Sequence, residues 1–333
     1  MSVHVTASAP TRIDLAGGTL DIWPLYLFHE NAQTLNAAIS LRAHVEISPR
    51  GDGRIHLESI DTARSLELSS WRELGGQTEL PLLCKLASFF RAANLTMRTR
   101  SESPAGAGIA GSSALNVAVC GALARWAGVD LDGETLLTIA QNVEAQVIRV
   151  PTGAQDYRPA YYGGVAAVEL HPEAVKRVAL HVNAADLERR IVLAYTGAPR
   201  NSGTNNWDIT KRHIDGDRHV FECFERIRDA TDGLRRALCA GDWRSAGVQI
   251  DLEWQARKTL APGVTTPAID SLIARAEAAG SRAAKVCGAG GGGCLFCFAD
   301  PPAVPAVKQA LVDGGARILE YHIEAQGLLV EAV

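Results

Sequence analysis

Residues 101–114 read SESPAGAGIAGSSA and are the most informative stretch of this chain. Its three glycines, Gly106, Gly108 and Gly111, lie among small residues and are followed directly by Ser112 and Ser113. Because glycine has no Cβ atom, such a loop can bring several backbone N–H groups close to one anion. Residues 114–127 have the apolar periodicity of a helix, which one of the two serines is placed to cap, so the positive helix N-terminus faces the same anion. Both hydroxyls can also ligate Mg²⁺ beside a phosphate, and we interpret the stretch as a nucleotide-phosphate site.

Two other interpretations of this loop stay open. The glycines also satisfy G-x-G-x-x-G, the dinucleotide fingerprint of a nicotinamide-dependent oxidoreductase. That fingerprint follows a buried, continuously apolar strand, whereas residues 95–100, LTMRTR, alternate between apolar and polar as in a half-exposed strand. The second alternative is a glycine-rich turn without a ligand. A Walker A loop is excluded, because no G-K-[ST] follows the glycines.

Composition and charge exclude several classes of protein. The chain has 333 residues, 47% of them apolar, which is enough for two domains with sizeable cores. A net charge of −4 with interspersed acids and bases argues against nucleic acid or an anionic membrane as partner. No apolar run has the length of a membrane span, and the first residues lack the pattern of a signal peptide. We therefore expect a cytoplasmic protein that acts on a small molecule, with a homodimer as an assembly to be tested.

The seven cysteines are odd in number and scattered along the chain. Only Cys294 and Cys297 have C-x-x-C spacing, and they lie in the apolar run CLFCF, where residues three apart point to opposite faces of a strand. We interpret them as reduced, buried cysteines rather than as a zinc or redox site.

The hydrophobic pattern predicts an α+β fold. Residues 3–97 are mostly short alternating stretches separated by turns, which indicates antiparallel strands. Helices are expected over residues 81–93, 114–127, 133–149 (capped by Asp132), 219–240, 243–260, 267–279 and 302–313. Further strands are expected over residues 164–170, 191–195, 284–287, 294–298, 316–323 and 328–332. Helices covering the faces of antiparallel sheets define the α+β class.

A second polar segment, residues 9–21, reads APTRIDLAGGTLD. In a strand, Arg12 and Asp14 share one face. Asp21 follows the turn at Gly17-Gly18 and precedes Trp23 and Tyr26. A carboxylate beside aromatic side chains can bind hydroxyl groups. A hairpin with a solvated acid is the alternative.

Residues 151–164, PTGAQDYRPAYYGG, form a third polar segment. If Asp156 lies beside Arg12, it can hold a hydroxyl group or accept its proton; a turn or helix cap is the alternative. Glu144, within the helix expected at 133–149, reads by itself as a solvated residue. Five glycines in residues 288–293, GAGGGG, indicate close approach to a ligand or another loop.

Three of these segments together resemble the motifs of the GHMP kinase superfamily (galactokinase, homoserine kinase, mevalonate kinase and phosphomevalonate kinase). They are PTRIDLAGG from Pro10, PAGAGIAGSSA from Pro104 and KVCGAGGGG from Lys285. The resemblance implies an N-terminal domain of ribosomal-protein-S5-like fold, placed at residues 1–180, and a C-terminal ferredoxin-like domain at 181–333. It also implies ATP, Mg²⁺ and transfer of the γ-phosphoryl group to a hydroxyl of a small molecule.

Within the superfamily, two segments resemble the branch of D-glycero-D-manno-heptose 7-phosphate kinases and fucose kinases. They are AQDY at residues 154–157, followed by YGG at 162–164, and YTGAPRNS at 195–202. Both types of enzyme phosphorylate an anomeric hydroxyl, so a sugar or sugar phosphate is the expected substrate. A non-sugar alcohol such as mevalonate or homoserine is the alternative, and a non-catalytic member that only binds a ligand is a further one.

Carried over residue by residue, the resemblance assigns roles to the site. Asp156 would be the catalytic carboxylate with Arg12 as its charged partner, and Glu144 with Ser112 or Ser113 would hold Mg²⁺. The nucleotide would contact Pro104, Gly106, Ala107, Gly108, Ile109, Gly111, Ser112 and Ser113. The substrate would contact Asp21, Gly18, Thr19, Gln155, Thr196, Arg200, Gly290, Gly291 and Gly292. Arg200, Lys211 and Arg212 could bind a substrate phosphate or form a solvated basic patch.

Overall fold

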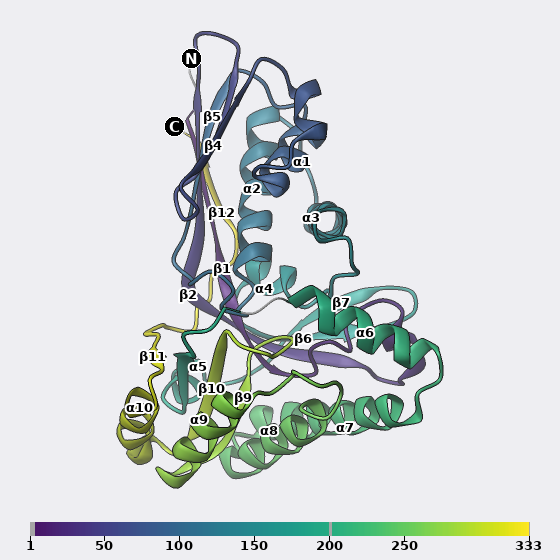
Figure 1. Cartoon of the computed structure of the whole chain (residues 1–333), viewed down its shortest axis with the longest axis vertical. Coiled ribbons are helices and arrows are strands. Elements are labelled where there is room, and N and C mark those ends of the chain that lie inside the picture. Colours follow the sequence, from purple (N-terminus) through teal and green to yellow (C-terminus); the bar gives the residue numbers. More distant parts are fainter. Residues whose placement is uncertain (1–3, 200–201, 333) are drawn as a thin grey trace.

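The computed structural model describes residues 4–199 and 202–332, and it contains two β-sheets with helices packed against them (Figure 1). The first sheet has the order β12-β1-β2-β5-β3-β4, and β6 and β7 extend it from β2. Its strands are β1 Val5–Ala16, β2 Gln33–Pro49, β3 Ile55–Ser59, β4 Arg64–Leu68, β5 Leu95–Ser101, β6 Val165–Leu170, β7 Val175–Ala179 and β12 Leu329–Ala332. The β3–β5 pair is parallel, where the sequence predicted antiparallel strands, and α1 (Pro81–Phe89) lies in the crossover that such a pair needs.

Helices cover one face of this sheet. They are α1, α2 (Gly111–Ala127), α3 (Gly133–Ile148) and the short α4 (Tyr157–Tyr162), with the 3₁₀ turn η2 (Trp71–Gly76) against α1. A second 3₁₀ turn, η1 (Leu25–Phe28), contacts α6 instead. In Figure 1, α2 runs along the strands, and α1 and α3 lie outside it. The burial of β1 alternates over its first residues and becomes continuous from Ala9 onward. The second half of β1 is therefore covered on both faces, by α2 and α4 on one side and by the second sheet on the other.

The second sheet is antiparallel, in the order β11-β8-β10-β9. Its strands are β8 Ile191–Tyr195, β9 Ser281–Val286, β10 Cys294–Ala299 and β11 Arg317–Ile318. The helices around it are α5 Ala184–Glu188, α6 Ser202–Ile214, α7 Arg218–Ala240, α8 Trp243–Arg257, α9 Pro267–Ala278 and α10 Val304–Asp313, with the 3₁₀ turn η3 Pro301–Ala303. Apolar side chains of β1, β2 and β6 pack against those of β8, β9, β10, α7 and α8, so one core joins the two sheets.

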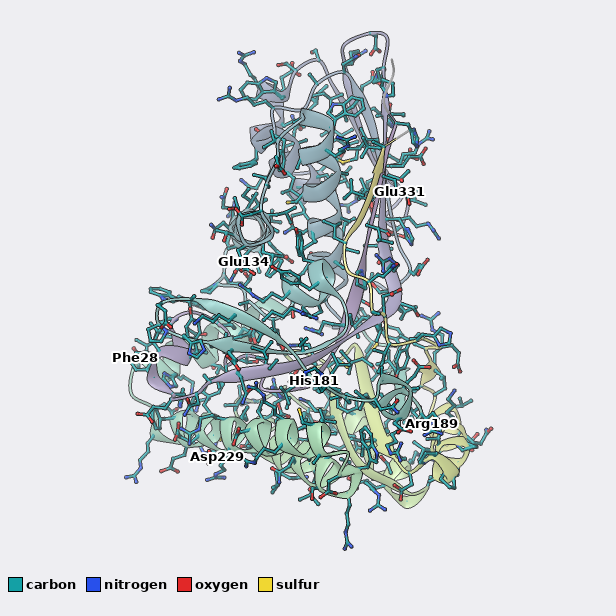
Figure 2. The ribbon with its side chains drawn as sticks, turned by 180° about the vertical axis from the view of Figure 1, so that it is seen from behind. Phe28, Glu134, His181, Arg189, Asp229 and Glu331 are labelled. Atoms are coloured by element: carbon teal, nitrogen blue, oxygen red, sulfur yellow. The ribbon has the colours of Figure 1, made fainter. Side chains whose placement is uncertain are left out.

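Both ends of the chain lie at the same end of the first sheet (Figure 1). β12 pairs with β1 in the register Val5↔Ala332 to Ser8↔Leu329, and Figure 2 shows Glu331 on this sheet, far from Arg189 and Asp229. The last residues therefore belong spatially to the sheet built by the N-terminal half. The division into residues 1–180 and 181–333 stays a prediction. Over the described residues, no helix combines the length and hydropathy needed to cross a membrane.

The α+β architecture is confirmed, and several details were wrong. Asp132 caps α3 as expected, with its side chain accepting from the backbone N–H of Thr135. The strand predicted over 316–323 is only Arg317–Ile318, and β7 and α6 were not predicted. The predicted helix from residue 114 begins at Gly111 instead, and neither Ser112 nor Ser113 caps it, because the N-cap is Ala110 in a left-handed conformation with φ +62°.

Candidate active site

The glycine-rich loop joins β5 to α2 and is held from two sides. Arg12 of β1 donates from its backbone N–H to the carbonyl of Ile109 and from its guanidinium to that of Gly108, both at 3.0 Å. From the second sheet, the backbone N–H of Cys294 donates to the carbonyl of Ala107. The loop is therefore fixed by long-range contacts that set its distance from both sheets. The first turn of α2 opens beside it with no side-chain cap, so its N–H groups are left for an anion.

The two serines contact Glu144 rather than the helix N-terminus. Ser112 Oγ and Ser113 Oγ donate to its two carboxylate oxygens at 2.8 and 3.0 Å, and Tyr157 Oη donates to Oε2 at 2.8 Å. Glu144 is buried, so the interpretation as a solvated residue was wrong. Burial also raises the pKa of its carboxyl group. A carboxylate with two hydroxyls at the edge of the loop is a set of hard oxygen donors of the kind that Mg²⁺ prefers.

Asp156, at the start of α4, forms an ion pair with Arg12. The guanidinium Nη2 and Nε lie 2.5 and 3.1 Å from the same carboxylate oxygen, and Arg12 is fully buried. Burial disfavours the charge of Arg12, but Asp156 and then Asp14 outweigh it and raise its pKa. The structure thus brings together the two residues that the resemblance paired. The second carboxylate oxygen of Asp156 stays available for a ligand.

Asp156 separates two pockets. One is the groove along the glycine-rich loop, whose lining includes residues 103–108 and 110–113, Glu144 and Asp156. The other is a small polar pocket lined by Arg12, Thr19, Asp21, Ile22, Gly153, Gln155, Asp156, Asn206, Gly288 and Ala289. A ligand group in the second pocket therefore meets one in the first at the Asp156 carboxylate.

Asp21 lies at the base of the second pocket. Its Oδ2 accepts from the backbone N–H of Gln155 at 2.8 Å, and Gly153 lies so close that a Cβ there would be 2.0 Å from the same oxygen. Burial, and next the charge of Asp156, raise the pKa of Asp21 to about 7. The side chain is thus a buried acid close to its titration point at neutral pH, not the solvated acid of a hairpin.

A buried group of charges, most of which was not predicted, supports the turn that carries Asp21. Glu253 and Arg257 of α8 form an ion pair, and Lys285 Nζ lies 2.8 Å from Glu253 and 3.8 Å from Asp14. All four side chains are at most 1% exposed. Arg257 also donates to the carbonyl of Gly18 at 2.8 Å and to Thr19 Oγ1 at 3.3 Å, while Glu253 accepts from the N–H of Gly17. Only Asp14, in the first motif, and Lys285, which opens the third, carried a sequence signal.

The expected substrate residues are only partly brought together. Gly18 packs against Asp14 and Gln155, where a Cβ would clash with both side chains, and Thr19 lines the polar pocket with φ +71°. Thr196 instead donates to the carbonyl of Gly293. Gly290, Gly291 and Gly292 pack against backbone carbonyls of Val264, Gly263 and Ala198, whereas Gly288 and Ala289 line the pocket.

The three basic residues considered for a substrate phosphate are not brought together either. Arg200 lies outside the described residues. Arg212 is bound to Asp217 and to the carbonyl of Leu260, and Lys211 is exposed. Conversely, Asn206 of α6 lines the polar pocket and was missed, because no motif or periodicity marks it.

The two cysteines of the C-x-x-C spacing, Cys294 and Cys297, are buried in β10, as expected.

Comparison with known proteins agrees with this arrangement. Residues 81–164 match the profile of the GHMP kinases N-terminal domain, and residues 234–316 match that of the GHMP kinases C-terminal domain. The two matched segments are those that carry the glycine-rich loop with Glu144 and Asp156, and the third glycine motif. The chain belongs to the GHMP kinases, a family of enzymes that use ATP.

Its relatives include kinases of different alcohols. The D-glycero-alpha-D-manno-heptose 7-phosphate kinase of Campylobacter jejuni is 28% identical over 97% of this chain and 98% of its own length. A mevalonate kinase of Thermococcus sibiricus is 25% identical over 99% of both chains. The crystal structure of a D-glycero-D-manno-heptose 1-phosphate kinase from Bacteriodes thetaiotaomicron superposes with a TM-score of 0.80 at 23% identity, covering 98% of each chain. At that identity the last likeness supports the two-domain fold alone.

Proposed function

We propose that this GHMP kinase transfers the γ-phosphoryl group of ATP, with Mg²⁺, to a sugar or sugar phosphate, and that the acceptor is the anomeric hydroxyl. The observation that carries the proposal is the position of Asp156, which lines both the groove of the glycine-rich loop and the polar pocket that holds Asp21. A phosphoryl donor and an acceptor hydroxyl can therefore meet beside one carboxylate, which is the geometry that phosphoryl transfer needs.

The nucleotide phosphates are assigned to the part of the loop that lines the groove, including Pro104, Gly106, Ala107, Gly108 and Gly111, and to the N-terminus of α2. Ile109, which the resemblance also assigned to the nucleotide, is buried in the core and is not part of this lining. Ser112, Ser113 and Glu144 would hold Mg²⁺, because they already place a carboxylate and two hydroxyls within hydrogen-bond distance of one another. When bound, the ion would neutralise phosphate charge. The protein's own contribution is positioning, from a loop that Arg12 and Cys294 hold on both sides.

Asp156 is assigned to orient the acceptor hydroxyl and to receive its proton. Arg12 donates to one of its carboxylate oxygens, which fixes the side chain and leaves the other oxygen free for the substrate. Arg12 is also held by the loop carbonyl of Gly108, so the same cation aligns the carboxylate with the phosphate site. This arrangement supplies alignment and charge, the two effects on which phosphoryl transfer depends most.

A sugar fits the polar pocket better than the carboxylate-bearing alcohols of other family members. Asp21 and Asp156 already place two acids there, and the cation among the lining residues, Arg12, is paired with Asp156. A third acid, the carboxylate of mevalonate or homoserine, would be repelled, whereas sugar hydroxyls can donate to these oxygens. The heptose kinase among the relatives, together with the AQDY and YGG segments, supports a reducing sugar and its anomeric hydroxyl.

The test is ADP release from Mg-ATP against a panel of free hexoses, 6-deoxyhexoses, uronic acids, heptose 7-phosphate, mevalonate and homoserine. Turnover of a reducing sugar that disappears with its methyl glycoside is expected, because the glycoside blocks the anomeric oxygen. Turnover of mevalonate or homoserine alone would overturn the proposed substrate class. A cytoplasmic location and a homodimer remain separate predictions, to be checked by fractionation and by light scattering of the purified protein.

A further inference from the structure

The polar pocket contains three buried oxygen atoms to which no group of the described residues donates a hydrogen bond. They are Asp21 Oδ1, Gln155 Oε1 and Asn206 Oδ1. Leaving a buried acceptor unpaired is costly, so an acceptor in a ligand pocket is best explained by a donor on the ligand. Three of them in one small pocket indicate a ligand that donates several hydrogen bonds.

Because all three atoms are hydrogen-bond acceptors, they restrict the ligand to one that carries donors. The two amide oxygens, and the Asp21 oxygen in its ionised form, can only accept, so their partners must be O–H or N–H groups. Phosphate or carboxylate oxygens at these positions would face acceptors without a proton between them. Neighbouring hydroxyls on a polyol or sugar ring satisfy all three atoms, and they do so while another hydroxyl of the same molecule lies at Asp156.

Asn206 differs from the other two in its origin. Asp21 and Gln155 belong to the N-terminal half and are joined by a hydrogen bond between the Gln155 N–H and Asp21 Oδ2. Asn206 comes from α6, in the C-terminal half, so a ligand that contacts all three is held from both parts of the chain.

The helix that carries Asn206 is fixed at its far end. His213 is buried, and its Nε2 lies 2.9 Å from Nε2 of His29, which in turn contacts Glu225 of α7. His213 also packs against the rings of Phe221 and Phe224. The α6 helix is therefore anchored to the segment after η1 and to α7, which holds Asn206 in position before a ligand arrives.

We infer that Asn206 binds one hydroxyl of the acceptor sugar and is a specificity-determining residue for that hydroxyl. The inference rests on the proposed function and deepens it: the pocket selects a substrate with three hydroxyls, one for each unpaired oxygen, besides the one that is phosphorylated. Because Asn206 contacts the ring and not the phosphoryl group, its contribution lies in sugar binding and not in ATP binding.

The test compares Asn206→Ala with Asp208→Ala, an exposed position on the same helix. For the best sugar of the panel and its monodeoxy analogues, KM and kcat are measured for the wild type and both variants. Loss of one hydrogen bond to a hydroxyl corresponds to a KM increase of about tenfold. We expect this for Asn206→Ala with the parent sugar, with the KM for ATP unchanged. One deoxy analogue, the one that lacks the hydroxyl bound by Asn206, should have a raised KM with the wild type and the same KM with Asn206→Ala. Asp208→Ala should have the wild-type KM for every sugar tested.

Other outcomes separate the two ideas. If the wild type phosphorylates a sugar but Asn206→Ala keeps the same KM and the same ranking of deoxy analogues, this inference is overturned and the proposed function stands. If the wild type phosphorylates no sugar, the proposed function fails and the inference fails with it. Should circular dichroism show that Asn206→Ala does not fold, Asn206→Ser is measured by the same criteria. Because its shorter side chain cannot reach the hydroxyl, we expect the same loss of discrimination among the deoxy analogues.

Discussion

Asp156 is the residue on which the proposed chemistry depends most directly, since it faces both pockets. Asp156→Asn keeps the shape but removes the charge that orients and deprotonates the acceptor. We expect kcat to fall by about 10²- to 10⁴-fold, the usual contribution of a general base. Mg-ATP affinity, measured by calorimetry, should stay within a few-fold, because the loop is also held by backbone hydrogen bonds. Wild-type turnover in this variant would remove Asp156 from the mechanism.

The raised pKa of Asp21 predicts that sugar binding depends on pH. Its pKa is raised to about 7, so the carboxyl is mostly protonated at pH 6 and ionised at pH 8. The ionised form accepts from a sugar hydroxyl with Oδ1, while Oδ2 stays bound to the Gln155 N–H, and binding by the protonated form first costs a proton. The KM for the sugar should therefore fall as pH rises from 6 to 8, by up to about tenfold because one pH unit below the pKa leaves about a tenth ionised. Asp21→Asn should flatten this profile, and a wild-type KM that does not vary with pH would contradict the role of Asp21.

Single residues differ in how far the sequence could predict them. Arg12 and Asp156 were paired because two motifs of one family bring them together, although 144 positions separate them. Glu144 alone gave the wrong expectation, since helical periodicity cannot show that a carboxylate faces two serines of another helix. Asn206 and Glu253 were missed for the same reason: each acquires its surroundings from segments far away in the chain.

At the scale of elements, the glycine motif of residues 288–293 has a packing role that can be separated from backbone strain. Gly293 has φ +78°, and a Cβ there would lie 2.6 Å from the carbonyl oxygen of Ala107 in the glycine-rich loop. Gly315 has a similar φ of +87° with nothing within 4 Å. Both Gly→Ala changes should cost about 1 kcal/mol for the left-handed backbone. Gly293→Ala should in addition displace the loop and raise the KM for ATP severalfold, while Gly315→Ala leaves it unchanged. Equal KM values would show that the contact does not position the loop.

Elements with local signals were predicted well. α3 and α7 begin at Asp caps and show clear periodicity, and their observed bounds lie within one residue of the expected ones. β8 was predicted over its whole length. By contrast, α6 begins with SGTNN, which has low helix propensity, and its buried residues include Ile209, Thr210 and His213, a pattern without a plain apolar face. Its helical state depends on packing against η1 and α7, which local sequence does not show.

At the scale of the whole molecule, the two halves are joined by charge as well as by apolar packing. Asp14 of β1 lies within 4 Å of Arg257 and Lys285, which belong to α8 and β9. Two acids and two bases are buried together, so the group is electrically neutral, and the pKa of Asp14 is lowered by the two cations and Arg12 despite its burial. The motifs assigned residues of the first and third glycine segments to one substrate site. They did not predict the ion pairs that join these segments, because Glu253 and Arg257 lie in α8, which has no motif.

This network predicts that the junction of the two halves controls sugar binding. Arg257→Met keeps a long side chain but removes the cation that holds Gly18, Thr19 and Glu253. Breaking a buried ion pair by removing one partner costs about 3–5 kcal/mol, because an uncompensated charge stays buried. We expect that loss in urea unfolding, together with a higher KM for the sugar, since Thr19 keeps its φ of +71° only while the turn is held.

The matched control is Arg282→Met, which removes an ion pair with Asp300 in which both side chains are more than 40% exposed. Exposed pairs contribute about 1 kcal/mol or less, so this variant should unfold close to the wild type and bind the sugar normally. If Arg257→Met were as stable as Arg282→Met, the buried group would not hold the two halves together. If it were destabilised but kept the wild-type KM for the sugar, the network would serve the fold alone, and Asp21 would be positioned by its contacts with Gly153 and Gln155.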